Sequence, residues 1–118
     1  MKVGIIGSGR LGLCFALLCE SAGYEVNIYD IDKNYLEKLK NIKFSTTEPE
    51  VQNLLKYSKN LNIYNEFEEV VLASDLVYTF VPTPSNLDGS YNIDIVNEIA
   101  NNFKKLESKI TNKKYFII

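Results

Sequence analysis

The chain has 118 residues, a formal net charge of −2 and a pI near 5.2. That length is typical of one domain, and the charge balance excludes the strongly basic surface with which proteins bind nucleic acid or anionic membranes. There is no histidine, which excludes a Ser-His or Cys-His nucleophile and an imidazole metal site within these residues. We therefore expect neither a catalytic residue nor a metal site in this chain.

The two cysteines, Cys14 and Cys19, lie five positions apart within one expected helix. That spacing matches neither a CxxC redox pair nor a zinc-binding pattern. We interpret both as small apolar core residues, which favours a reducing, cytoplasmic setting. No segment has the length of a membrane span, and residues 7–10 interrupt the apolar run that a signal peptide would need.

The first expected element is a short buried strand, KVGII, at residues 2–6. A helix over residues 10–22 follows and ends at Gly23, a residue favoured just after a helix. Its apolar face, at positions i, i+3, i+4 and i+7, comprises Leu11, Cys14, Phe15 and Leu18. A second strand, EVNIY, occupies residues 25–29.

The remaining expected elements continue this alternation of strands and helices. In order they are a helix at 32–40 capped by Asp32, a loop at 41–48, a helix at 49–57 with Pro49 in its first turn, a strand at 61–64, a helix at 66–73, a strand at 76–81, a loop at 81–92, a helix at 93–106 and a strand at 115–118. The expected inward faces are Val51, Leu54 and Leu55, and then Ile93, Val96, Ala100 and Phe103.

Alternating strands and helices predict an α/β fold with helices on both faces of a parallel sheet. We expect a Rossmann-type, doubly wound sheet in the order 3-2-1-4-5 that is truncated after its fifth strand.

The stretch GSGRLG at residues 7–12 has the spacing GxGxxG. It follows a predicted strand and opens a predicted helix, which is the context of a dinucleotide-binding turn. Gly7 allows a tight turn, Gly9 lets the backbone approach a pyrophosphate, and Gly12 lets the helix pack close to the strand. The N-terminus of the helix then offers N–H groups to the phosphates. The alternative is that three glycines shape a turn that binds no ligand.

Asp30 closes the second strand, 18 positions after Gly12. Its carboxylate can accept hydrogen bonds from an adenosine ribose, and it would repel a 2′-phosphate. Two such charges about 4 Å apart, at an effective dielectric constant near 20, interact by about 4 kcal/mol. Asp30 therefore predicts NAD rather than NADP, although Lys33 is near enough to weaken that preference. The alternative is a surface aspartate with no ligand.

Five pieces of the sequence follow one another in a characteristic order: KVGIIGSGRLG, AGYEVNIYDID, the pair Glu48–Pro49, SDLVYTFVPTP and DGSYNID. This order resembles the N-terminal, NAD-binding domain of the UDP-glucose/GDP-mannose (nucleotide-sugar) dehydrogenases over essentially all 118 residues. The glycine turn is shared by many Rossmann proteins, whereas the VPTP loop followed by DGS is much more specific. That family oxidises the C6 alcohol of a sugar nucleotide to a carboxylate with NAD, so the resemblance implies the same cofactor here.

The resemblance implies NAD contacts in the glycine turn, at the ribose aspartate and at Thr83 of the VPTP loop. The topology points to Thr83 independently, because it follows the fourth strand at its carboxyl end, beside the first strand. The alternative for Thr83 is a threonine whose conformation is set only by its flanking prolines. Together, the candidate cofactor-binding residues are Gly7, Ser8, Gly9, Arg10, Leu11, Gly12, Asp30, Lys33, Val81 and Thr83.

The sequence also departs from the family pattern. Arg10 stands where an aromatic residue is common, and Leu11 stands where valine is common. Tyr35 stands five residues after the ribose aspartate, where the family often has Lys or Arg, and Lys33 is the candidate substitute. The family's catalytic cysteine lies far downstream in a sugar-binding domain, and neither cysteine of this chain corresponds to it.

The first hypothesis is therefore that residues 1–118 are the cofactor domain of a nucleotide-sugar dehydrogenase, present as a fragment. Such a chain should bind NAD without turnover and should meet a sugar nucleotide only together with the absent domains. Two alternatives stay open: a non-catalytic NAD(H)-binding regulatory module, and the Rossmann domain of a hydroxyacid or hydroxyacyl dehydrogenase. The apolar strand YFII at the end of the sheet would be an exposed edge, which predicts self-association.

Overall fold

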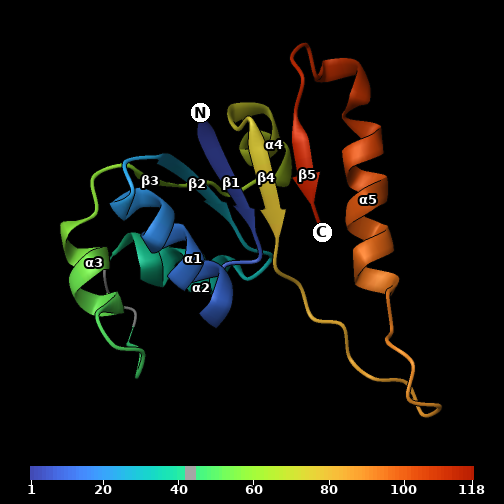
Figure 1. Ribbon diagram of the computed structural model, residues 1–118, viewed down its shortest axis with the longest axis horizontal. Coiled ribbons are helices and arrows are strands. Elements are labelled where there is room, and N and C mark those ends of the chain that lie inside the picture. Colours follow the sequence, from blue (N-terminus) through green and yellow to red (C-terminus); the bar gives the residue numbers. More distant parts are fainter. Residues whose placement is uncertain (42–44) are drawn as a thin grey trace.

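The computed structural model describes residues 1–41 and 45–118. They form a parallel sheet of five strands in the order β3-β2-β1-β4-β5 (Figure 1). The strands are β1 (Lys2–Ile6), β2 (Glu25–Tyr29), β3 (Leu61–Ile63), β4 (Leu76–Thr79) and β5 (Tyr115–Ile117). The helices are α1 (Arg10–Ser21), α2 (Lys33–Lys40), α3 (Val51–Tyr57), α4 (Phe67–Ala73) and α5 (Asp94–Lys105), and a 3₁₀ turn, η1 (Glu107–Lys109), follows α5. The predicted doubly wound sheet and its strand order are confirmed.

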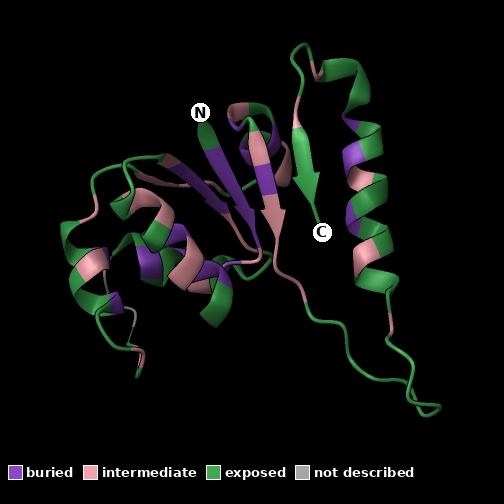
Figure 2. Cartoon of the chain, in the orientation of Figure 1, coloured by how far each residue is buried: buried purple, intermediate pink, exposed green. Residues whose placement is uncertain are grey.

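Two hydrophobic cores lie on opposite faces of this sheet, because successive side chains of a strand point to opposite sides. Ile5 packs with α1, α2 and α3 on one face, whereas the next residue, Ile6, packs with α4 and α5 on the other. Figure 2 shows the buried positions concentrated in β1, β2 and the sheet-facing sides of the helices. Both helical layers therefore fix the same central strand, β1.

The strand order reverses beside β1, which pairs with β2 on one side and with β4 on the other. The last residues of these strands are in register, since Ile6 pairs with both Tyr29 and Thr79. In doubly wound sheets the ligand binds outside the carboxyl ends of the strands at such a switch point. The topology thus brings the segments after β1, β2 and β4 to one edge.

The predicted apolar face of α1 is wrong at Leu11 and Leu18, whereas Cys14 and Phe15 pack, partly buried, against the core. Leu11 and Leu18 are 67% and 64% exposed, and the buried residues of the helix are Gly12, Leu13, Ala16 and Leu17. The cause is Gly12: a Cβ at this position would lie 2.0 Å from the Gly7 carbonyl oxygen, so Gly12 sits directly against the turn. That contact fixes the rotation of the helix and turns the two leucines to solvent.

Several predicted boundaries also shift. α3 begins at Val51 rather than at Pro49, because Glu50 has a left-handed backbone with φ +62° and stands outside the helix. β4 ends at Thr79 rather than at residue 81. The inward face of α5 is Ile99 and Phe103, with Leu106 beyond its end, whereas Ile93 and Ala100 are exposed. Residues 42–44 of the predicted loop at 41–48 lie outside the described residues.

Two other local predictions, the cap at Asp32 and the packing of the two cysteines, are confirmed. The Asp32 side chain caps α2 by accepting a hydrogen bond from the Tyr35 backbone N–H at 3.0 Å. Cys14 and Cys19 are free thiols that pack, partly buried, against the core beneath α1. Among the described residues, no helix is long and apolar enough to cross a membrane.

Candidate functional site

The turn after β1 depends for its shape on Gly7 and on Gly12, whose contact with the Gly7 carbonyl is described above. Gly7 has φ +86°, a conformation that L side chains rarely adopt, and a Cβ there would lie 2.0 Å from the Phe80 carbonyl oxygen. The Gly7 N–H donates to the Tyr29 carbonyl oxygen at 2.9 Å. The backbone of the turn is therefore packed between the ends of β2 and β4, with no room for a side chain.

Gly9 is different, because a Cβ at this position would meet no atom within 4 Å. Packing does not require glycine here, so the absence of a side chain leaves open space at the N-terminus of α1. The first intrahelical hydrogen bond of α1 runs from the Leu13 N–H to the Gly9 carbonyl oxygen at 2.8 Å. The N–H groups of the first turn have no intrahelical acceptor, and with the positive end of the helix dipole they favour an anion at this point.

The Asp30 carboxylate is fixed beside this turn. One carboxylate oxygen, Oδ2, accepts the Ser8 backbone N–H at 2.8 Å and lies 3.4 Å from the Ser8 hydroxyl. The other, Oδ1, accepts the Asp32 N–H at 3.0 Å. Ser8 is fully buried and Asp30 is half-buried, so the carboxylate is anchored on its inner side and open on its outer side.

Tyr35, in the first turn of α2, stands where the family pattern often has Lys or Arg. Its hydroxyl donates a hydrogen bond to the Ser8 carbonyl oxygen. Ser8 is therefore held on both sides, by Asp30 at its N–H and by Tyr35 at its carbonyl. The only sequence signal was the position of Tyr35, three residues after the cap of the helix that follows Asp30.

The two basic candidates of the site both have acidic partners in this structure. Arg10, at the start of α1, forms an ion pair with Glu48, and its side chain is 74% exposed. The Lys33 ammonium lies 3.1 Å from Glu66 Oε1 and donates to the Asn65 carbonyl oxygen. Lys33 is thus held at the N-terminus of α4, an arrangement that sequence spacing alone did not indicate.

Of the two candidate cofactor-binding residues in the segment after β4, Val81 and Thr83, only Val81 lies close to the turn. The Val81 side chain lies 3.5 Å from the position that a Cβ on Gly7 would occupy. Thr83 lies further along the loop and is exposed. At the end of β4, the buried hydroxyl of Thr79 has no hydrogen-bond partner among the described residues, which leaves one polar group unsatisfied at this edge of the sheet. The structure therefore gathers Gly7, Ser8, Asp30 and Val81 closely and leaves Thr83 in solvent.

A cavity of about 330 Å³ adjoins the turn. Its wall is formed by Gly9, Arg10 and Cys14 from the turn and α1, by Tyr35 from α2, and by residues 45–48 and 51. The described residues contain no group of three or more His, Cys, Asp or Glu side chains that could hold a metal ion. The chemistry that converges here is that of anion binding and of hydroxyl recognition by a carboxylate.

Residues 1–118 match the family model described as the UDP-glucose/GDP-mannose dehydrogenase family, NAD binding domain. The chain belongs to this family. A related protein, the UDP-N-acetyl-D-mannosamine dehydrogenase of Methanococcus vannielii, is 36% identical over 109 residues, which cover 83% of this chain and 25% of that protein. The UDP-glucose 6-dehydrogenase of Streptococcus pneumoniae is 30% identical over 92 residues, 78% of this chain and 23% of that protein.

Solved structures agree on the fold. A ternary complex of GDP-mannose dehydrogenase from Pseudomonas aeruginosa superimposes with a TM-score of 0.90 at 22% identity, over 98% of this chain and 27% of that one. The UDP-N-acetyl-mannosamine dehydrogenase Cap5O from Staphylococcus aureus gives a TM-score of 0.76 at 28% identity, over 89% of this chain and 26% of that one. The chain thus spans about a quarter of the length of the relatives it matches.

The family match establishes this chain as an NAD-binding domain, and it disfavours both alternatives, the regulatory module and the hydroxyacid or hydroxyacyl dehydrogenase. The residues present fit NAD. The open space at Gly9 is a cradle that a side chain would fill, and the half-buried Asp30 carboxylate has the chemistry to accept hydrogen bonds from ribose hydroxyls. The N-terminus of α1 has N–H groups that would suit a pyrophosphate.

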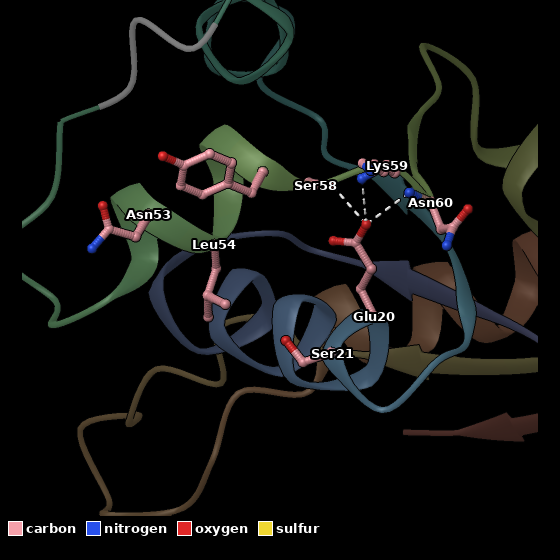
Figure 3. A pocket seen from close by; sticks show the side chains of 8 residues that line it. Glu20, Ser21, Asn53, Leu54, Ser58, Lys59 and Asn60 are labelled. Atoms are coloured by element: carbon pink, nitrogen blue, oxygen red, sulfur yellow. Dashed lines mark hydrogen bonds between the residues drawn. The ribbon is translucent and has the colours of Figure 1, made fainter.

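A second pocket of about 320 Å³ lies at the opposite, amino-terminal edge of the sheet, between the end of α1 and the segment that leads into β3. Glu20 dominates it, but one of its carboxylate oxygens already accepts hydrogen bonds from the Ser58 hydroxyl at 2.9 Å and from the Lys59 and Asn60 N–H groups at 2.8 and 2.7 Å (Figure 3). We interpret Glu20 as an anchor for the β3 segment rather than as part of a ligand site.

Proposed function

We propose that this NAD-binding domain is the cofactor-binding part of a nucleotide-sugar 6-dehydrogenase. Such an enzyme oxidises the C6 alcohol of a sugar nucleotide to a carboxylate. The observation that carries the proposal is the match of all 118 residues to the family model. The Asp30 carboxylate, which is hydrogen-bonded to the glycine turn, supports it. The relatives named above act on sugars attached to a nucleoside diphosphate. The substrate class proposed here is therefore a nucleoside diphosphate sugar.

The roles of the chain's own residues follow from their places. The Asp30 carboxylate accepts hydrogen bonds from the hydroxyls of the adenosine ribose, and the backbone N–H groups of the turn bind the pyrophosphate. When bound, NAD supplies the acceptor for the hydride removed from the sugar. The proposed contact residues are Gly7, Ser8, Gly9, Arg10, Leu11, Gly12, Asp30, Lys33, Val81 and Thr83.

Two of these contacts require a rearrangement. Arg10 would exchange Glu48 for the pyrophosphate, and Lys33 would leave Glu66 to reach the ribose. An exposed ion pair is worth only about 0–1 kcal/mol, so the exchange is inexpensive for Arg10. We rank Arg10 above Lys33, because the Lys33 ammonium also donates to the Asn65 carbonyl oxygen.

We further propose that residues 1–118 act as one cofactor domain, and that the sugar site comes from residues outside them. Hydride transfer requires the reacting carbon to be held against the nicotinamide, and a binding domain alone does not position it. The chain has no histidine, and burial raises the pKa of the Cys19 thiol, which lies away from the site, so its reactive thiolate is disfavoured. The cytoplasmic setting stays a prediction from the two unpaired cysteines.

The test combines binding and turnover on the purified chain. Thermal melting should show stabilisation by NAD, whereas mixtures of NAD with UDP-glucose, UDP-N-acetylmannosamine or GDP-mannose should produce no NADH. The Asp30→Ala variant serves as the control for binding. NADH production by the chain alone would contradict the proposal that it is only the cofactor-binding part, and a folded chain that NAD does not stabilise would contradict the proposed site.

A further inference from the structure

Tyr35 joins α2 to the glycine-rich turn through the backbone of Ser8. Its hydroxyl donates to the Ser8 carbonyl oxygen, and the half-buried side chain lines the same cavity as Gly9 and Arg10. Burial raises the pKa of Tyr35 to about 12, and the negative charge of Asp30 adds to the rise while the bond to Ser8 opposes it. The hydroxyl therefore remains protonated, and remains a donor, at any physiological pH.

The bond from Tyr35 also fixes the direction of the next N–H group. All peptide bonds among the described residues are trans, and in a planar trans peptide the C=O and N–H bonds point in opposite directions. Because the Ser8 carbonyl is directed at Tyr35, the Gly9 N–H must point away from Tyr35. The preceding peptide is fixed as well, since the Ser8 N–H is bonded to Asp30 at 2.8 Å.

Nothing in the covalent structure of Gly9 holds this orientation. The peptide between Ser8 and Gly9 can flip by a paired change of the Ser8 ψ and the Gly9 φ, and glycine adopts positive and negative φ with similar ease. Gly9 is exposed, and the space around its missing Cβ is open to 4 Å, so no packing at the Gly9 Cβ position opposes the flip. A flipped peptide would put a carbonyl oxygen, with its partial negative charge, where a donor to the pyrophosphate is needed.

We propose that Tyr35 is a positioning residue for the dinucleotide: its hydroxyl holds the Ser8 carbonyl, prevents the flip of the Ser8–Gly9 peptide, and keeps the Gly9 N–H available to a phosphate. This inference rests on the assignment of NAD to the glycine turn. The turn is then held by two hydrogen bonds to Ser8. One comes from Tyr35 of α2, and we call it the lock; the other goes to Asp30 at the end of β2.

The first test compares Tyr35→Phe with Tyr57→Phe, a matched loss of a hydroxyl from a side chain that is 70% exposed and lines the other pocket. Tyr35→Phe should weaken NAD binding about threefold to tenfold, the range expected for one hydrogen bond. Its affinity for adenosine, which has no phosphate, should stay within about twofold of the wild type. Tyr57→Phe should change neither affinity. Equal weakening of NAD and adenosine, or no weakening of NAD, would overturn the proposal.

The second test needs no ligand and separates this proposal from the assignment of NAD. Relaxation dispersion of the Gly9 amide nitrogen detects exchange on the μs–ms timescale. Exchange should appear at Gly9 in Tyr35→Phe and be absent in the wild type and in Tyr57→Phe. If NAD fails to bind the wild type, the proposed function fails, while this measurement still decides the role of Tyr35: a Gly9 amide that remains static in Tyr35→Phe would refute the lock.

Discussion

Ser8 and Asp30, 22 residues apart in the sequence, are joined by a hydrogen bond of 2.8 Å from the Ser8 N–H to Asp30 Oδ2. This bond couples the end of β2 to the turn after β1. Since each carboxylate oxygen has two lone-pair sites, and Oδ1 accepts only the Asp32 N–H among the bonds described above, acceptor capacity remains on the outer side of Asp30. The carboxylate can therefore anchor the turn and bind a ribose at once.

The Asp30→Asn substitution should weaken NAD binding by about tenfold or more, because hydrogen bonds to a charged acceptor contribute about 1.5–3 kcal/mol. The ratio of the NADP to the NAD dissociation constant should fall, since the charge that repels a 2′-phosphate is gone. Titration with NADH, followed by its fluorescence, gives both effects. Asp32→Asn is the matched control, because asparagine also caps helices and this change removes a neighbouring charge without removing the cap. Similar losses in both variants would argue against a specific role for Asp30.

Two glycines of the same turn should respond in opposite ways to alanine. Gly12→Ala should destabilise the fold by about 2 kcal/mol or more, since its Cβ would lie 2.0 Å from a backbone oxygen. Gly9→Ala should cost at most about 1 kcal/mol, the difference between glycine and alanine as an N-cap. It should nevertheless reduce NAD affinity at least tenfold by filling the cradle. Urea unfolding and NAD titration separate the two effects, and full NAD affinity in folded Gly9→Ala would disprove the cradle.

The contribution of Tyr35 to stability should depend on pH. Its pKa is raised from 10.0 to about 12 in the folded protein, first by burial and then by the charge of Asp30. Between these values the unfolded chain loses the proton first, so the stability from Tyr35 is complete below pH 10.0 and declines as the pH rises toward about 12. The difference in urea midpoint between the wild type and Tyr35→Phe should shrink over this range. A difference that stays constant would mean that the hydroxyl is not shielded.

The edge strand β5 should drive self-association of the chain. Tyr115 and Ile117 are 55% and 44% exposed, and β4 is the neighbour of β5 in the described sheet. An exposed apolar edge is a template for pairing with a second copy. Sedimentation velocity should show association that increases with concentration, and Ile117→Lys should reduce it. A wild-type chain that stays monomeric at high concentration would show that this edge is protected.

Much of the architecture could be predicted from the sequence, because strand and helix alternation and the glycine spacing are local patterns. The strand order and the cap at Asp32 are confirmed, and Asp30 directly follows β2 as expected. The face of α1 could not be predicted from hydrophobic spacing alone. It depends on the contact between Gly12 and Gly7, a backbone packing constraint that outweighs the burial of two leucines.

The polar contacts of the site were less predictable, because they join segments that only the fold brings together. The partners of Arg10 and Lys33 are Glu48 and Glu66, which follow them by 38 and 33 residues. The bond from Tyr35 to the Ser8 carbonyl depends on how α2 packs beside the turn. The glycine turn points to Arg10, and the spacing to Asp30 points to Lys33, but neither pattern contains information about these partners.

The most direct test of the central claim is calorimetric titration of the purified chain with NAD and, separately, with NADP. If the turn and Asp30 form a working cofactor site, NAD should bind with a stoichiometry of one and NADP should bind at least about tenfold more weakly, in line with a charge repulsion of several kcal/mol discounted for solvent. A folded chain that binds neither dinucleotide, or that binds NADP as tightly as NAD, would contradict the account.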